Sequence, residues 1–383
     1  QAADIYRRTG AIGSLPFTLW VLAELVAGAG ELQASRAYVD EAIALAETVR
    51  DVQSAAYRPL GYGRLALAEQ DYPLAIAKLA EASDILSGHD ADALRVSALT
   101  LLARAHLGAG DVAGALVATG RATAIHRAHD LAEVEGMDRE ELWWVHARAL
   151  AASGKAVASQ RALATAYRFV VERIANVSDE GLRRNFLDKG GTRRAIVAAW
   201  VGQSRKRRSG SKLRIPHLVG KTSLSEPFER LADTGLRMNE LRSAAELHEF
   251  LIDEATELSG AERVLLVLET PDGPRLAGSL VPRGEDAQAL LRDVAPMLAR
   301  VRGTRAASLS YTPDRADALD QRSHVVAPLV AQHKLAGFLY LDIDGTFGRF
   351  HETDRDMMGM LAAQAAVALD NAQWSQGLER KVA

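Results

Sequence analysis

The sequence contains no cysteine, although it is 383 residues long. Without a thiol there is no disulfide framework, thiolate nucleophile, iron–sulfur cluster, zinc ribbon or thioether-linked chromophore. The absence is compatible with a reducing compartment. A chain of this length buries enough apolar surface to fold without such cross-links, and it is long enough for two or three domains.

An excess of one charge and long apolar runs are also missing. The 46 basic and 49 acidic residues leave a formal charge of -3, which favours neither nucleic acid nor an anionic membrane as a partner. The longest apolar stretch, residues 15–30, is interrupted by Glu24 and is shorter than the roughly 20 residues of a membrane helix. No signal-peptide pattern opens the chain. We therefore expect a cytoplasmic protein that binds no membrane and no nucleic acid.

Aromatic residues make up only 5% of the chain, whereas alanine and leucine are abundant, a composition that favours helices packed closely through small residues. The first 200 residues repeat one phrase, in which an apolar helix runs into a turn and a second alanine-rich helix follows. The turns fall at Gly30, Gln70, Gly110 and Gly154, about 40 residues apart. A repeat of this length indicates a stacked helical solenoid.

Small residues recur where the paired helices must touch. They are Ala23, Gly63, Ala103 and Ala147 in the first helices, and Ser35, Ala75, Ala115 and Ser159 in the second. The pattern resembles the tetratricopeptide repeat (TPR), although these units are longer than the family's roughly 34 residues. The resemblance implies an all-α array over 1–200 that binds a protein partner, as in large bacterial signalling proteins. A spacer between other domains remains an equal alternative.

Residues 201–223 contain seven lysines and arginines and no acid, accompanied by serine, glycine and proline. Such a run can bind nucleic acid or lipid, but no aromatic side chain is interleaved to stack on bases. We therefore interpret it as a solvated basic linker between two domains.

The second half mixes strands with helices. We predict a helix over 244–259 that ends at Gly260, and a hairpin around the turn 270–274. A helical insert broken at Pro296 follows, and then a second hairpin around 332–334. Thr353 is predicted to cap a long final helix. The predicted strands are 263–269, 275–281, 324–330 and 335–343.

Four blocks of this half occur in the order typical of the GAF domain, which they resemble. The blocks are 326–330 (VAPLV), 335–342 (LAGFLYLD), 350–354 (FHETD) and 361–372 (LAAQAAVALDNA). The resemblance implies an α+β GAF domain over 224–372 with a central antiparallel sheet and a long C-terminal helix. It also implies a small-ligand sensor or a dimerisation module, with a pocket between the sheet and the insert. Residues 373–383 are expected to begin a signalling helix.

Four side chains are our candidates for the pocket: Tyr311, Arg322, His324 and Tyr340. Each of them also suits the rim or the core of such a domain. Arg355 stands where cyclic-nucleotide-binding members carry glutamate, which argues against that ligand. Bilin attachment through a thioether is excluded. We expect no haem and no metal, since isolated histidines are usually turn or surface residues, and we leave an unidentified small molecule as the ligand.

Signatures of catalysis are missing from the sequence. There is no phosphate loop, nucleophile elbow, metal-spaced histidine pair or kinase motif, and residues 219–223 (VGKTS) lack the first glycine of a phosphate loop. We predict a non-catalytic sensory region that dimerises through its C-terminal helix. It would relay to a histidine kinase or a nucleotide cyclase outside this chain. The alternative is a ligand-free dimerisation scaffold.

Overall fold

The computed structural model describes residues 15–28, 30–46, 52–130, 134, 136–207, 215–218, 225–241, 243–314 and 316–382. They divide into two compact units, Gln1–Phe169 and Val170–Ala383. The first is a helical array and the second is built on a sheet, so the predicted fold class is confirmed. None of the described helices combines the length and the apolar character needed to cross a membrane.

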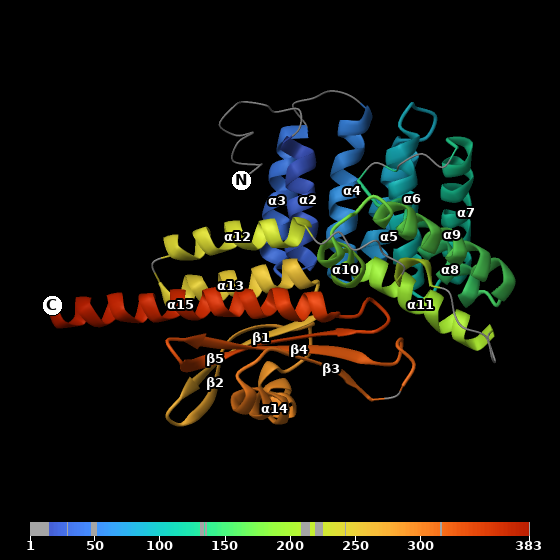
Figure 1. The fold of residues 1–383 in the computed structure, drawn as a ribbon. Coiled ribbons are helices and arrows are strands. Elements are labelled where there is room, and N and C mark those ends of the chain that lie inside the picture. The colour runs from blue at the N-terminus through green and yellow to red at the C-terminus, as the bar shows by residue number, and fades with distance from the viewer. Residues whose placement is uncertain are drawn as a thin grey trace. The chain divides into compact units, whose positions relative to one another are not determined.

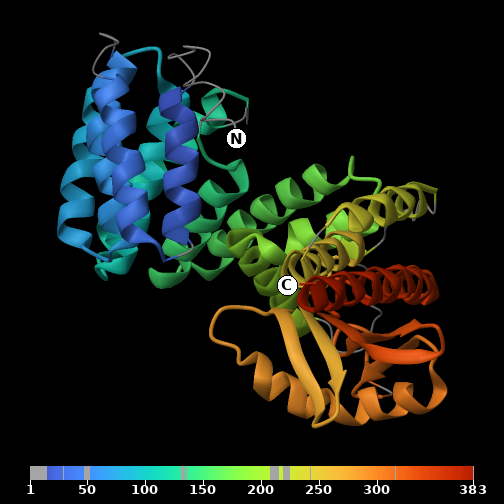
Figure 2. The same cartoon turned by 90° about the vertical axis from the view of Figure 1, so that its left-hand side faces the viewer.

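Helical hairpins that stand side by side form the first unit (Figures 1 and 2). Its helices are α2 (Leu15–Gly28), α3 (Leu32–Ala46), α4 (Val52–Ala68), α5 (Tyr72–Ile85), α6 (Asp92–Gly108), α7 (Val112–Ala128), α8 (Arg139–Ala152) and α9 (Ala156–Ile174), the last of which continues into the second unit.

The four predicted turns lie between the helices of each hairpin. Gly30, Gln70, Gly110 and Gly154 all have positive φ angles, of 87°, 61°, 78° and 77°. This left-handed conformation ends the first helix, and glycine adopts it without the steric penalty of a Cβ. Asp111 then caps α7, because its carboxylate accepts a hydrogen bond from the backbone N–H of residue 114.

The predicted small residues mark close helix contacts. A Cβ on Gly63 would lie 2.6 Å from Leu79 Cγ, so α4 and α5 approach as closely as only glycine permits. Ser159 Oγ in α9 donates to the carbonyl oxygen of Ala147 in α8 at 2.8 Å. The helical repeats inferred from the spacing are therefore confirmed as packed hairpins.

The second unit begins with α10 (Glu180–Lys189), α11 (Gly191–Arg207), the 3-10 turn η1 (Pro216–Leu218) and α12 (Ser225–Glu240). The first two lie largely within the residues predicted as the all-α array, whereas η1 and α12 were not predicted. The division between the units thus precedes the basic segment that we expected to separate two domains. Parts of that segment, 208–214 and 219–223, lie outside the described residues. The domain limits given by the sequence remain a prediction.

Arg184 shows why α10 belongs to the second unit. Its side chain is 1% exposed, and its two terminal nitrogens lie 3.0 and 3.2 Å from the two carboxylate oxygens of Asp354. It also donates to the carbonyl oxygen of Ser259 at 3.0 Å. Gly260 and Gly348 leave the space that this side chain fills. One buried guanidinium therefore joins α10 to two helices of the sheet domain.

The sheet has the order β2-β1-β5-β4-β3, with every neighbouring pair antiparallel. Its strands are β1 (Arg263–Thr270), β2 (Gly273–Leu280), β3 (Ser308–Thr312), β4 (Arg322–Ala331) and β5 (Lys334–Asp344). Four of them match the predicted strands. The fifth, β3, is an edge strand of five residues that the sequence analysis missed.

Helices cover both faces of this sheet (Figure 1). On one face lies α14 (Ala287–Thr304), whose apolar side packs on β1, β4 and β5. It runs through Pro296 without the predicted break, because that residue is exposed and the carbonyl it leaves unpaired can reach water. The other face is covered by α13 (Ala244–Ser259) and α15 (Glu352–Val382), and α12 packs on these two helices (Figure 1).

The start of α15 differs slightly from the prediction. The helix begins at Glu352, so Thr353 lies inside its first turn and is not the cap. His351 holds the N-cap position, and the carboxylate of Asp354, three residues later, accepts a hydrogen bond from its backbone N–H at 2.7 Å, as the third helical residue does in a capping box.

Candidate functional site

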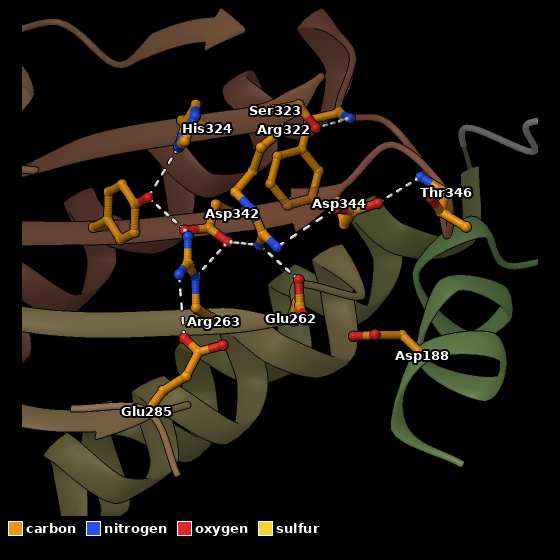
Figure 3. A network of polar contacts seen from close by, with 12 residues as sticks. Asp188, Glu262, Arg263, Glu285, Arg322, Ser323, His324, Asp342, Asp344 and Thr346 are labelled. Carbon is orange, nitrogen blue, oxygen red and sulfur yellow. Dashed lines mark hydrogen bonds and ion pairs between the residues drawn. The ribbon is translucent and has the colours of Figure 1, made fainter. Parts of the chain in front are cut away.

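Three of the four predicted site residues meet at one end of the sheet, on the face that α14 covers. Arg322 and His324 are two residues apart on β4 and therefore share a face. Tyr340 on β5 packs against α14 as part of the apolar core. Its hydroxyl lies 2.9 Å from His324 Nδ1 (Figure 3).

Tyr311, the fourth candidate, lies on the opposite face. In the antiparallel ladder it pairs with Ser323, whereas Ser310 pairs with His324. Partners in such a ladder point to the same side of the sheet. The Tyr311 hydroxyl donates to the carbonyl oxygen of Phe350 at 3.2 Å. The structure thus brings three candidates together and leaves Tyr311 apart.

Asp342 is the centre of the cluster, and sequence reasoning missed it. Its side chain is completely buried, and it accepts hydrogen bonds from Tyr340 (2.5 Å), Arg322 (2.5 Å) and Arg263 (2.9 Å) (Figure 3). An acidic residue at the end of the apolar strand β5, two positions after Tyr340, was the available signal. The alternation of strand side chains places both on one face.

The hydrogen bonds around Tyr340 fix the form of His324. Because the single Tyr340 hydroxyl proton goes to Asp342, its oxygen accepts from His324 Nδ1–H. Burial lowers the pKa of His324, so the ring is neutral and Nε2 carries a lone pair. That atom is buried, and no hydrogen bond reaches it from the described residues. The cluster therefore ends in an unused hydrogen-bond acceptor.

Glu262 extends the cluster to the helices that precede the sheet. Its carboxylate accepts from Arg322 at 2.6 Å and from Arg194 of α11 at 2.5 Å, and its carbonyl oxygen accepts from Lys189 of α10 at 2.9 Å. Asp188 also contacts Arg194. Burial and the charge of Glu262 raise the pKa of Asp188 to about 6. An unbroken set of polar contacts thus joins His324 to α11.

Both arginines of the sheet cluster are already paired with carboxylates. Arg263 contacts Asp342 and also Glu285, at 3.1 Å, while Arg322 contacts Asp342 and Glu262. Burial lowers the pKa of each arginine, but these carboxylates outweigh it and raise both pKa values above the ordinary range. Since both guanidiniums are already paired, they leave little attraction for a phosphate.

The remainder of this sheet face is apolar. Leu265, Val267 and Phe338 lie under Val294 and Leu298 of α14. These side chains are fully buried and pack directly against the helix.

The family model described as GAF domain matches residues 243–371. This part of the chain is a GAF domain. The match confirms the resemblance read from the four sequence blocks and gives the region a sensory or regulatory role. The GAF domain holds the polar cluster within its sheet, and α10 and α11 contact that cluster from outside the matched residues.

Two solved structures are similar to parts of the chain. The cyanobacteriochrome TePixJ GAF domain is 18% identical and aligns with 36% of this chain and 95% of its own, with a TM-score of 0.29. Aspartyl phosphate phosphatase F from Bacillus subtilis is 14% identical and aligns with 66% of this chain and 68% of its own, with a TM-score of 0.34. A comparison with curated proteins found no match.

Proposed function

We propose that this chain is the non-catalytic sensory region of a bacterial signal-transduction protein that acts in the cytoplasm. The helical array binds a protein partner, and the GAF domain binds a small molecule on the sheet face under α14. The response passes through α15 to an output domain outside these residues, which is a histidine kinase or an adenylate or guanylate cyclase.

The observation that carries the proposal is the polar path from His324 to α11. It starts at the buried, unused Nε2 of His324 and passes through Tyr340, Asp342 and Arg322 to Glu262. A ligand that donates a hydrogen bond to Nε2 would change the first member of this path. Because the groups share buried hydrogen bonds, a change at one end alters the energy of the others.

The chemistry of the path narrows the ligand class. An acceptor lone pair in a cluster whose arginines are already paired favours a hydroxyl or amine group rather than a phosphate. The paired arginines thus disfavour a cyclic nucleotide, as does Arg355 in the place of a glutamate.

A thermal-shift screen of the 383-residue chain tests the sensor. A metabolite that binds only the folded state, present at a concentration of about 100 times its Kd, adds about 2.7 kcal/mol to the free energy of unfolding. This corresponds to a rise of several degrees in the melting temperature. His324→Asn retains a donor for Tyr340 but removes Nε2, so it should abolish the shift. His333→Ala, in the turn between β4 and β5, is the control and should keep it.

Two outcomes would overturn the sensor proposal. One is a broad panel in which no compound raises the melting temperature. The other is a shift that His324→Asn leaves unchanged, because the ligand would then bind elsewhere.

Dimerisation through α15 is the second candidate function, with or without a ligand. Met360 and Val367 are 40% and 51% exposed, and they are seven residues apart on the same side of α15. Apolar residues at heptad spacing are typical of a seam between paired helices. The seam supports a homodimer, which would also serve a scaffold without a ligand.

Light scattering of the full chain tests this seam. Val367→Lys should convert a dimer to a monomer, because a buried lysine in the seam would lack a partner. Val157→Lys is a matched control, since Val157 is 65% exposed on α9 of the array. A monomeric parent chain, or equal effects of both substitutions, would contradict the dimer.

A further inference from the structure

An open groove on the first unit lies between α7, α8 and α9. Its volume is about 550 Å³, and its lining includes Arg127, Trp143, His146, Arg161 and Arg168. We call it the arginine groove. It is far from the sheet in sequence, and neither the GAF domain nor the resemblance to TPR repeats assigns it a role.

Small side chains on α9 create the hollow. Ala158, Ala162 and Thr165 line the groove and are spaced by four and three residues, which places them on one side of the helix. Leu150 of α8 contributes an apolar wall. A volume of this size falls within the range of about 300–1,000 Å³ seen for binding sites.

The groove has an excess of positive charge. Three arginines face it, whereas Asp130 is the one acid among its lining residues. Elsewhere in the array Arg36 and Arg104 form ion pairs with glutamates. Within the described ranges Arg127 and Arg161 form no such pair. Their charges are therefore available to an anion from outside.

The aromatic side chain in the groove, Trp143, also favours a ligand that accepts hydrogen bonds. Trp143 is 4% exposed, and the guanidinium of Arg127 lies over its ring, 4.8 Å from the centroid. Its buried indole N–H finds no acceptor among the described residues. Burial and the neighbouring Arg127 lower the pKa of His146, which keeps that ring neutral. Guanidinium and indole groups are both donors, and a carboxylate is an acceptor for both.

We propose that the arginine groove binds an acidic segment of a partner protein, whose carboxylates pair with Arg127 and Arg161. The inference rests on the proposed role of the array in protein binding and names the chemistry of the partner. The open form of the groove favours an extended chain, since small-ligand sites enclose most of their ligand.

The test uses the full 383-residue chain and a fluorescein-labelled oligoglutamate peptide, with binding followed by anisotropy at low salt. Arg127→Glu/Arg161→Glu should weaken binding at least about tenfold, because each charge-assisted hydrogen bond contributes on that scale. Arg121→Glu/Arg148→Glu is the matched control. These two arginines are exposed on α7 and α8 outside the groove, and the double variant has the same net charge.

Since all four substituted arginines are exposed, the variants should keep the far-ultraviolet circular dichroism of the parent. Equally weakened peptide binding in both double variants would overturn the groove proposal, because the peptide would then respond only to the net charge of the chain. Unchanged affinity in Arg127→Glu/Arg161→Glu would also overturn it.

The basic segment is the main competing site for such a peptide. If Arg205→Gln/Lys206→Gln abolishes binding while Arg127→Glu/Arg161→Glu does not, the peptide binds there and the groove proposal fails. Displacement by pyrophosphate at lower concentration than by unlabelled peptide would show a small-anion site and would equally overturn it. The thermal-shift screen of the GAF domain is independent of all these outcomes, so the two proposals can fail separately.

Discussion

Replacing Arg184 by methionine tests whether α10 is an integral part of the GAF unit. The guanidinium is 1% exposed and forms two hydrogen bonds to Asp354, which lies 170 positions away in the sequence. Methionine keeps an unbranched apolar chain of comparable length. The substitution therefore removes the charge and its hydrogen bonds while it retains much of the packing.

The expected loss of stability follows from what remains behind. Removing one member of a buried ion pair costs about 3–5 kcal/mol, because the other charge is left buried without its partner. Asp354 is 7% exposed and keeps one hydrogen bond, from the backbone N–H of His351. We therefore expect the lower end, about 3 kcal/mol. For a unit of this size that lowers Tm by roughly 6–12 °C.

Calorimetry and urea unfolding of the full chain provide the measurement. Two units give two transitions, and only that of the second unit should move, since Arg184 lies within it. Arg184→Met/Asp354→Asn should recover part of the lost stability, because the asparagine amide leaves no unpaired charge in the interior. A loss below about 1 kcal/mol, or a double variant less stable than Arg184→Met, would refute the reasoning.

Four further substitutions have clear expected outcomes. Burial raises the pKa of Asp188 from 3.8 to about 6, so the folded protein loses stability as the pH rises from about 4 to about 6. Asp188→Asn should remove the fall in the urea midpoint over this pH range. For His217 the pH dependence is reversed: burial lowers its pKa from 6.5 to about 4, so the folded protein loses stability as the pH falls from 6.5 to about 4. His217→Asn should reduce this loss in the urea midpoint. Gly63→Ala should cost about 1–3 kcal/mol in thermal unfolding, because its Cβ would meet a leucine of α5. Gly120→Ala, in open space on α7, should instead stabilise by about 0.5–1 kcal/mol, and equal effects of the two would refute the packing argument.

The helical array was the part most accessible from the sequence. Its turns are local: a left-handed residue such as Gly110, followed by Asp111 as a cap, ends one helix and begins the next whatever the rest of the chain does. The strands β1, β2, β4 and β5 were found for a similar reason, since each hairpin is specified by its own turn and apolar pattern. The edge strand β3 has neither signal, because none of its five residues is fully buried.

The candidate site was only partly accessible. Of the four candidates, Arg322, His324 and Tyr340 lie together in the structure, whereas Tyr311 lies on the other face of the sheet, and Asp342 was not among the candidates. Which face a strand residue occupies depends on the register with its neighbours, and a shift of one position reverses it. The register between β3 and β4 is set by the assembled sheet rather than by either strand.

The sequence by itself determined the two kinds of unit, the repeat turns and the order of strands in each hairpin, because periodicity and turn chemistry act over a few residues. Only the tertiary structure decided that α10 and α11 belong with the GAF unit, since Arg184 and Asp354 meet across 170 positions. The same holds for the contacts of Glu262 with Arg194 and Arg322, and for the arginine groove, whose lining comes from three helices. Burial makes such contacts strong, and burial is a property of the assembled fold.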